Sequence, residues 1–226
     1  MGVITIERKV LEKDDELALL NRRLLAARGI FSINLVSSPG SGKTSLLERT
    51  LERLGERPGA PRVAVIEGDV QTDIDAQRVA RYGIPAVQIV TRGGCHLEAA
   101  LVRDALAGLP LDGIGLLFIE NVGNLVCPAN YDLGESLKAV VISTTEGDDK
   151  PLKYPGMFRK AGVLVINKTD LLPYVDCRLE RLRAHALGVN PALTIFETSC
   201  TTGEGIGAWC DWLMAQAAAA GGAPCR

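Results

Sequence analysis

Three residues with metal-binding side chains stand out in two short stretches of the sequence. Cys95 and His96 lie side by side in "TRGGCHLEAAL", and Cys127 lies in "ENVGNLVCP". Two thiolates and an imidazole suit Zn²⁺ or Ni²⁺, whereas Mg²⁺ prefers oxygen ligands. The alternative is that Cys95 is a helix-start thiol with a lowered pKa, His96 a polar residue of a first helical turn and Cys127 a core thiol. A metal site requires that the fold bring the two stretches together.

The stretch "SSPGSGKTS" has the residue types of a phosphate-binding loop. It follows an apolar run and opens a helical pattern, so successive backbone N–H groups and a helix N-terminus would point at the phosphates. Lys43 would neutralise the outer phosphates, and the Thr44 hydroxyl would reach Mg²⁺. The first glycine of the usual pattern is Ser37 here. The residues predicted to bind the phosphates are Gly40, Ser41, Gly42, Lys43, Thr44 and Ser45.

The stretch "VINKTD" predicts which base the nucleotide carries. An Asn-Lys-x-Asp sequence at a strand end resembles the base-reading motif of GTPases, in which Asp170 would accept hydrogen bonds from N1 and N2 of guanine. Lys168 would lie over the base, and Asn167 would hold this loop against the phosphate loop. In "TSCTTGEG", the backbone of Ser199 and Cys200 would lie near guanine O6. Adenine lacks the N1 and N2 donor pair, so the motif predicts GTP rather than ATP.

Acidic residues at two other strand ends are predicted to hold Mg²⁺ or to position water. Glu120, in "FIENVG", stands where many GTPases carry Asp, and Gly123 can offer an N–H to the γ-phosphate. Asp69 and Asp75 have the same two roles, or are alternatively a helix N-cap and a solvated first-turn charge. The predicted catalytic set is Lys43, Asp69, Asp75 and Glu120, and the predicted Mg²⁺ set is Thr44, Asp75 and Glu120. No glutamine or arginine takes the place of a known catalytic finger, so slow GTP hydrolysis is expected.

These stretches belong to a predicted alternation of strands and helices. Seven apolar runs rich in Val and Ile indicate strands covered on both faces, at residues 31–37, 62–68, 86–90, 114–121, 138–144, 162–168 and 193–199. Helical patterns occupy residues 14–29, 43–54, 73–83, 96–108, 175–188 and 205–220, and residues 122–136 and 145–161 are predicted as long loops. The order predicts a three-layer α/β fold of the P-loop NTPase type with a mostly parallel sheet. Residues 1–29 would form an N-terminal extension with a helix, residues 30–219 a GTPase domain and residues 220–226 a flexible tail.

Composition and charge exclude several classes of partner. The 226 residues carry 25 Lys and Arg against 27 Asp and Glu, without the basic cluster of a nucleic-acid binder. No apolar run approaches the roughly 18 residues of a membrane span, and the N-terminal residues lack the apolar core of a signal peptide. We therefore expect a cytoplasmic protein with reduced thiols and with neither nucleic-acid nor membrane partners.

The predicted metal ligands fall at the same edge as the nucleotide residues. Ligands of an open parallel sheet gather beyond the carboxyl ends of its strands, and Cys95 and His96 follow the third predicted strand while Cys127 follows the fourth. Three ligands leave a tetrahedral site open to water, to a second copy across a two-fold axis or to a metal acceptor. Because Cys127 comes soon after Glu120 and Gly123, we expect nucleotide state to shift a metal ligand.

Taken together, the stretches resemble one known family. "SSPGSGKT", "GDVQTDID", "GGCHLEA", "ENVGNLVCP", "NKTD" and "TSCTTGEG" look like those of the hydrogenase nickel-incorporation GTPases, the HypB family, and the likeness runs from about Asn34 to the last predicted helix. The resemblance implies a GTPase of the signal-recognition and nitrogenase-iron-protein class that forms a homodimer with GTP. It implies Ni²⁺ or Zn²⁺ on Cys95, His96 and Cys127 at the subunit interface, with other hydrogenase maturation proteins and the hydrogenase large subunit as partners. The 226 residues contain no Cys-x-x-Cys-Gly-Cys site or His-rich stretch of the kind some relatives carry. Neither tight nickel binding nor nickel storage is therefore expected, and the interface site is the one metal site expected.

The prediction is thus a GTP-hydrolysing metallochaperone that uses GTP and Mg²⁺ and delivers nickel to [NiFe]-hydrogenase. Three alternatives stay open at this point. One is a GTPase for assembly of urease or a cobalamin enzyme, one is a P-loop small-molecule kinase that should prefer ATP, and one is an interaction module with structural zinc. Lys153, in "DDKPLKYP", is a further candidate for contact with the nucleotide or the opposite subunit.

Overall fold

The computed structural model describes residues 6–69, 78–79 and 81–222 of the chain. Within these residues, seven strands form one parallel sheet in the order β3-β2-β4-β1-β5-β6-β7. The strands are β1 (Phe31–Ser37), β2 (Arg62–Asp69), β3 (Ala86–Val90), β4 (Ile114–Glu120), β5 (Leu137–Ser143), β6 (Val163–Asn167) and β7 (Thr194–Glu197). The predicted α/β fold with a parallel sheet is confirmed.

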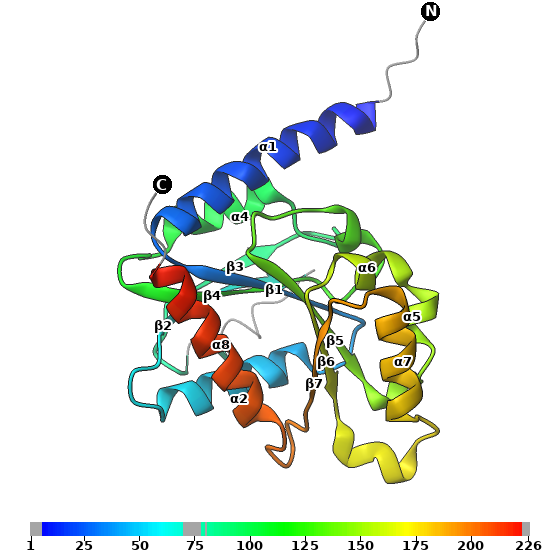
Figure 1. Ribbon diagram of the computed structural model, residues 1–226. Coiled ribbons are helices and arrows are strands. Elements are labelled where there is room, and N and C mark those ends of the chain that lie inside the picture. Colours follow the sequence, from blue (N-terminus) through cyan, green and yellow to red (C-terminus); the bar gives the residue numbers. More distant parts are fainter. Residues whose placement is uncertain (1–5, 70–77, 80, 223–226) are drawn as a thin grey trace, which may run out of the picture.

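Helices cover both faces of the sheet and make the three layers (Figure 1). The described helices are α1 (Ile6–Ala27), α2 (Lys43–Gly55), α4 (Ala99–Gly108), α5 (Lys150–Lys153), α6 (Pro155–Lys160), α7 (Leu179–Val189) and α8 (Ile206–Gly221). Short 3-10 turns occur at η1 (Cys127–Asn130), η2 (Thr144–Glu146) and η3 (Thr169–Tyr174). None of the helices that the structure describes combines the length and the hydropathy that a membrane crossing requires.

Side-chain alternation along the strands explains why the predicted runs are almost wholly apolar. In β2, Val63 and Val65 pack into the cluster formed with α2 and α8, whereas Ala64 and Ile66 pack into the cluster formed with α1 and α4. A third cluster joins β5 and β6 to α6 and α7. Strands covered on both faces need apolar residues at every position, which is the pattern that the sequence shows.

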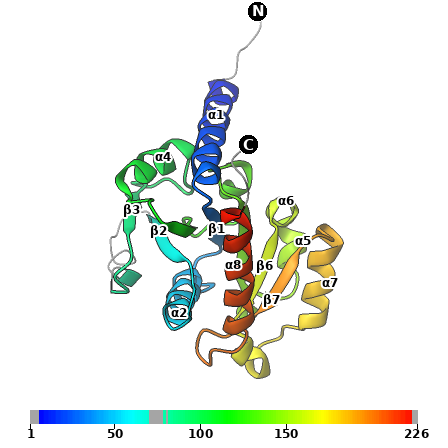
Figure 2. The same ribbon diagram turned by 60° about the vertical axis from the view of Figure 1, so that its left-hand side comes forward.

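The C-terminal end of helix α1 packs in the core, and its N-terminal part extends away from the rest of the molecule. Leu25, near its end, packs with Leu106 of α4 in one buried cluster. The N-terminal part of α1 extends past the rest of the molecule in both ribbon views (Figures 1 and 2). The helix starts at Ile6, earlier than the residue 14 that the sequence pattern predicted.

One other prediction about the elements was wrong. Residues 145–161, predicted as a loop, contain η2, α5 and α6. Pro151 and Pro155 lie in the first turns of α5 and α6, where a missing N–H does no harm because that donor has no partner within the helix anyway. The predicted helix at residues 73–83 lies mostly outside the described residues, and so does Asp75.

Candidate functional site

The predicted phosphate loop connects β1 to α2 in a conformation that depends on glycine. Gly40 and Gly42 have φ angles of 77° and 95°, which L side chains rarely adopt. A Cβ on Gly42 would lie 2.5 Å from Nδ2 of Asn167, whereas a Cβ on Gly40 would meet nothing within 4 Å. Glycine at position 42 therefore lets the loop after β6 approach the phosphate loop.

The residues that begin α2 meet the end of β4. The buried Lys43 donates from Nζ to Ser37 Oγ at 3.0 Å. Thr44 donates from Oγ1 to Glu120 Oε1 at 2.7 Å. A hydroxyl and a carboxylate oxygen are the ligands that Mg²⁺ prefers, so this pair fits a magnesium site. Gly123 lies against the same loop, because a Cβ there would be 3.2 Å from Cα of Pro39.

Two further carboxylates, Glu67 and Asp69, lie on β2. Glu67 is buried and pairs in register with Glu120 on the neighbouring β4. Asp69, the last residue of β2, pairs in register with Val90 of β3 and so lies nearer the loop that carries Cys95. The sequence pattern singled out Asp69 but not Glu67, since Glu67 falls inside an apolar run. Both carboxylates lie at or near the carboxyl end of the strand, although the roles of Asp69 and Asp75 stay predictions.

The predicted base-reading residues form a connected group beside the phosphate loop. Asn167 donates from Nδ2 to the Ser41 carbonyl at 3.1 Å, and Lys168 donates from Nζ to the Gly40 carbonyl at 2.8 Å. Ser199 donates from Oγ to Asp170 Oδ1 at 2.6 Å. These contacts bring the loop after β6 and the loop after β7 onto the phosphate loop, the arrangement that a bound nucleotide needs.

Cys200 is a poor nucleophile in this position. Burial raises its pKa to about 11, and the thiol donates to Asn167 Oδ1 at 3.3 Å. The side chain is thus protonated at neutral pH and helps to orient Asn167.

Sequence reasoning did not identify two polar side chains that bond to the phosphate loop, Glu146 and Lys150. They are called the strap. Glu146 accepts from Ser41 Oγ at 2.6 Å, and Lys150 donates to Ser38 Oγ at 3.0 Å and pairs with Glu146 at 3.0 Å. Burial opposes ionisation of Glu146, but the hydrogen bonds from Ser41 and Ser143 and the Lys150 ammonium outweigh it and lower the pKa of this carboxyl. Ser143 and Glu146 form a capping box around η2, and its Ser-x-x-Glu pattern is readable in the sequence.

The lysine singled out in the sequence, Lys153, is not part of that strap. It is largely exposed and pairs with Asp149 at 2.7 Å. Within the described contacts it is Lys150, one turn earlier on α5, that touches the phosphate loop.

The three predicted metal ligands converge in the structure. Cys95 and His96 lie between β3 and α4, Cys127 begins η1, and one ligand atom from each lies within 4.8 Å of the other two. Cys95 Sγ lies 3.5 Å from Nδ1 of His96. Two sulfur atoms and one imidazole nitrogen at these separations fit Zn²⁺ or Ni²⁺.

The structure disfavours the alternative interpretation of these residues. The Cys127 thiol, hydrogen-bonded to Cys95, raises the pKa of Cys95, with burial adding to the effect. The pKa is therefore not lowered by a helix N-terminus, and α4 begins only at Ala99. Cys127 is partly exposed rather than a core thiol.

One buried side chain, which the sequence pattern missed, joins the nucleotide residues to the metal ligands. Asn121 follows Glu120 directly and is 2% exposed. Its Oδ1 accepts from the backbone N–H of Leu97, next to His96, at 3.2 Å and from Val122 N at 3.0 Å. A movement of the segment after β4 would therefore reach the His96 backbone through one hydrogen bond.

Comparisons with known proteins agree with this arrangement. Residues 31–197 match the family model described as CobW/HypB/UreG, nucleotide-binding domain. The chain is 54% identical over 215 residues to the hydrogenase maturation factor HypB of Azotobacter vinelandii, covering 95% of this chain and 70% of that protein.

Solved structures give the same result at two levels of similarity. HypB from Helicobacter pylori, solved in complex with nickel, superposes with a TM-score of 0.86 at 34% identity, over 95% of this chain and 99% of that one. The signal recognition particle 54 kDa protein from Aeropyrum pernix K1, solved with GDP, is 20% identical over 91% of this chain and 50% of that one, with a TM-score of 0.57. The second likeness concerns the fold alone, and it agrees with the predicted class of P-loop protein.

Proposed function

The chain belongs to the HypB family of hydrogenase maturation factors, and we propose that it carries nickel or zinc on Cys95, His96 and Cys127 and delivers nickel during assembly of [NiFe]-hydrogenase. Membership in this family makes the chain a GTPase, as predicted, and decides against a small-molecule kinase. The observation that carries the proposal is the convergence of two sulfur donors and one imidazole nitrogen within 4.8 Å of one another, on two loops at the nucleotide edge.

In the proposed reaction, the chain's own residues position GTP and neutralise its charge. Lys43 would neutralise the outer phosphates, and Thr44 and Glu120 would hold Mg²⁺, which would screen the charge of the phosphate oxygens. Asp170 accepts from guanine N1 and N2 and so selects GTP. Slow hydrolysis is expected because the sequence has no glutamine or arginine in the place of a known catalytic finger, and Asp69 or Asp75 would orient water.

We propose that nucleotide state and metal affinity are coupled through the segment after β4. Glu120 is the last residue of β4, and Asn121, Gly123 and Cys127 follow it on this one segment. A change in the Glu120 environment on hydrolysis would move Cys127 directly and would move His96 through the Asn121–Leu97 hydrogen bond of 3.2 Å. A change in the separation of the donor atoms changes metal affinity, because the ligand distances of Zn²⁺ and Ni²⁺ sites are narrow.

The proposed metal site is completed by a second copy of the chain. Three ligands leave one tetrahedral position open. Cys95 is exposed, and the neighbouring Val126 is an apolar side chain with 60% exposure. A two-fold interface over this face would cover Val126 and supply further thiols from the partner copy. Sedimentation with a non-hydrolysable GTP analogue and with GDP tests this: the dimer is expected with the analogue.

Complementation tests the delivery role. A strain that lacks its own copy of this protein would express the wild type, the double variant Cys95→Ala/Cys127→Ala, or the control Cys177→Ala, which removes a buried thiol between α6 and α7. At limiting nickel, the double variant should leave hydrogenase inactive while the purified variant still hydrolyses GTP. The control should restore hydrogenase activity.

Two results would count against the proposal. Full hydrogenase activity with the double variant would remove the cargo role of these thiols. If the strain without this protein lost urease activity but kept hydrogenase activity, the proposal would change to assembly of another nickel enzyme.

A further inference from the structure

The His96 ring needs support from outside its own loop. Its Nδ1 lies 3.5 Å from Cys95 Sγ, and its Nε2 lies 3.8 Å from Oε1 of Glu98. A half-turn of the ring about the Cβ–Cγ bond would put Cδ2 in the place of Nδ1 and Cε1 in the place of Nε2, and so would turn Nδ1 away from the Cys95 thiol. Histidine ligands in proteins are generally held in one orientation by neighbouring groups that do not themselves bind the metal.

Tyr131 supplies such a contact. Its ring stacks on the imidazole of His96, with 3.8 Å between the ring centroids and an angle of 27° between the planes. Tyr131 directly follows η1, which begins at Cys127. The ring from one ligand-bearing segment therefore covers a face of the ligand on the other segment, and it restricts rotation of His96 relative to Cys127.

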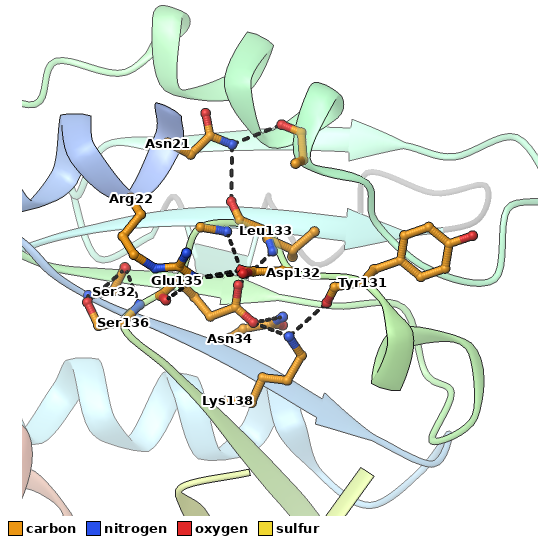
Figure 3. Close-up of polar contacts among 12 residues, drawn as sticks. Asn21, Arg22, Ser32, Asn34, Tyr131, Asp132, Leu133, Glu135, Ser136 and Lys138 are labelled. Atoms are coloured by element: carbon orange, nitrogen blue, oxygen red, sulfur yellow. Dashed lines mark hydrogen bonds and ion pairs between the residues drawn. The ribbon is translucent and has the colours of Figure 1, made fainter. Parts of the chain in front are cut away.

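The backbone of Tyr131 is itself fixed from the core. Lys138 of β5 donates from Nζ to the Tyr131 carbonyl at 2.7 Å and forms a buried ion pair with Glu135. Glu135 also accepts from Asn34 Nδ2 of β1 at 3.2 Å and from Leu133 N at 2.7 Å. Figure 3 shows these groups meeting below the Tyr131 backbone while its ring points away from them.

Helix α1 ties the same two segments together. The buried Asn21 donates from Nδ2 to the carbonyls of Ala99, at the start of α4, and Leu133, at 2.9 and 3.1 Å. Arg22 donates to Asp132 at 2.7 Å. Asn34 of this network also accepts from Asn121 Nδ2 at 3.3 Å, but none of the described contacts joins the network to the predicted phosphate-binding or base-binding residues. Its position indicates that it holds the loop of Tyr131 against the loop of His96.

We infer that Tyr131 is a positioning residue of the metal site, whose stacked ring holds the His96 imidazole with Nδ1 toward the Cys95 thiol. The inference rests on the proposed function, because it gives that metal site its orientation. The contact is made by the aromatic ring and not by the hydroxyl, so Tyr131→Phe should keep the metal site. Tyr131→Leu has an apolar side chain without a ring and should weaken metal binding.

The metal-free protein offers the first readout. The chain has two histidines, so proton–carbon correlation spectra of the protein without an affinity tag resolve the rings of His96 and His185. Loss of the stacked ring should move the His96 signals downfield in Tyr131→Leu and leave them near the wild-type position in Tyr131→Phe. His185 of α7, whose Nδ1 lies 2.8 Å from the Asp148 carbonyl oxygen, is the internal control.

Metal binding is the second readout. Tyr131→Leu should bind Zn²⁺ and Ni²⁺ about 10-fold or more weakly than the wild type, and should change the sulfur-to-nickel absorption band. Tyr131→Phe should restore both. GDP affinity and melting temperature of the two variants report whether the rest of the fold is intact.

The possible results separate the inference from the proposed function. Unmoved His96 signals in Tyr131→Leu, or wild-type metal affinity in that variant alongside weak binding by Cys95→Ala/Cys127→Ala, would overturn the role of Tyr131 and leave the metal site standing. Metal binding by the wild type that does not depend on the two thiols would overturn the proposed function and the inference with it.

Discussion

Replacing Asn167 with alanine should weaken both the fold and nucleotide binding. Asn167 is 1% exposed and donates from Nδ2 to the Ser41 carbonyl at 3.1 Å. Its Oδ1 accepts from Thr198 Oγ1 and from Cys200 Sγ, each at 3.3 Å. Together with Lys168, which donates to the Gly40 carbonyl, it joins the loop after β6 to the phosphate loop, and it also contacts the segment after β7.

The size of the effect follows from these partners. Alanine leaves the Ser41 carbonyl and the buried Thr198 hydroxyl without this side chain, and a buried polar group that loses its partner costs about 1–3 kcal/mol. We expect the free energy of unfolding to fall by about 2–4 kcal/mol. We assign about 2 kcal/mol of this loss to holding the two loops in the arrangement that binds nucleotide. That free energy corresponds to a fall in GDP affinity of about 30-fold.

Asn190→Ala is the matched control. Asn190 donates from Nδ2 to the carbonyls of Phe158 and Ala161 at 3.0 and 2.9 Å, near the start of β6 and thus at the opposite edge of the sheet. Urea unfolding and fluorescent GDP titration would be measured for both variants. Asn190→Ala should lose stability and keep its GDP affinity. Wild-type GDP affinity in Asn167→Ala, or an equal loss in both variants, would refute the assigned role of Asn167.

Three further predictions concern the base, the coupling and the strap. Asp170→Asn should shift preference from GTP toward XTP, because an amide donates to the xanthine O2; unchanged discrimination in competition binding would contradict the base assignment. Asn121→Leu should bind GDP and Zn²⁺ but lose the dependence of Zn²⁺ affinity on nucleotide; a wild-type dependence would rule out its linking role. Glu146 has a lowered pKa, so its contribution to stability is present above the ordinary value of 4.5 and is lost as pH falls below it; Glu146→Gln should flatten the decline of melting temperature in that range, and an unchanged decline would place the acid sensitivity elsewhere.

The parts of the fold that sequence reasoning recovered are those whose signal is local. The strands are continuous apolar runs because each is covered on both faces, and the phosphate and base loops are contiguous motifs. Residues 145–161 were misjudged because Pro151 and Pro155 suggest a loop. Their position in first helical turns shows only once the helices are known.

The metal site also contains residues that the sequence identifies and residues that it does not. Cys95 and His96 are adjacent in the sequence, and the parallel topology was enough to expect Cys127 near them. The contacts of Asn121, Lys150 and Tyr131 depend on how loops from different strands pack. Nothing in their spacing distinguishes them from ordinary polar or aromatic loop residues, so only the three-dimensional arrangement identifies them.

The most direct test of the account is metal affinity measured as a function of nucleotide. Ni²⁺ and Zn²⁺ would be titrated into the wild type, Cys95→Ala/Cys127→Ala and the control Cys177→Ala, each with GDP and with a non-hydrolysable GTP analogue. Wild type and control are expected to bind each metal with affinities that differ between the two nucleotides, and the double variant is expected to bind weakly with both. Equal wild-type affinities with GDP and with the analogue would contradict the coupling of GTP to the metal site.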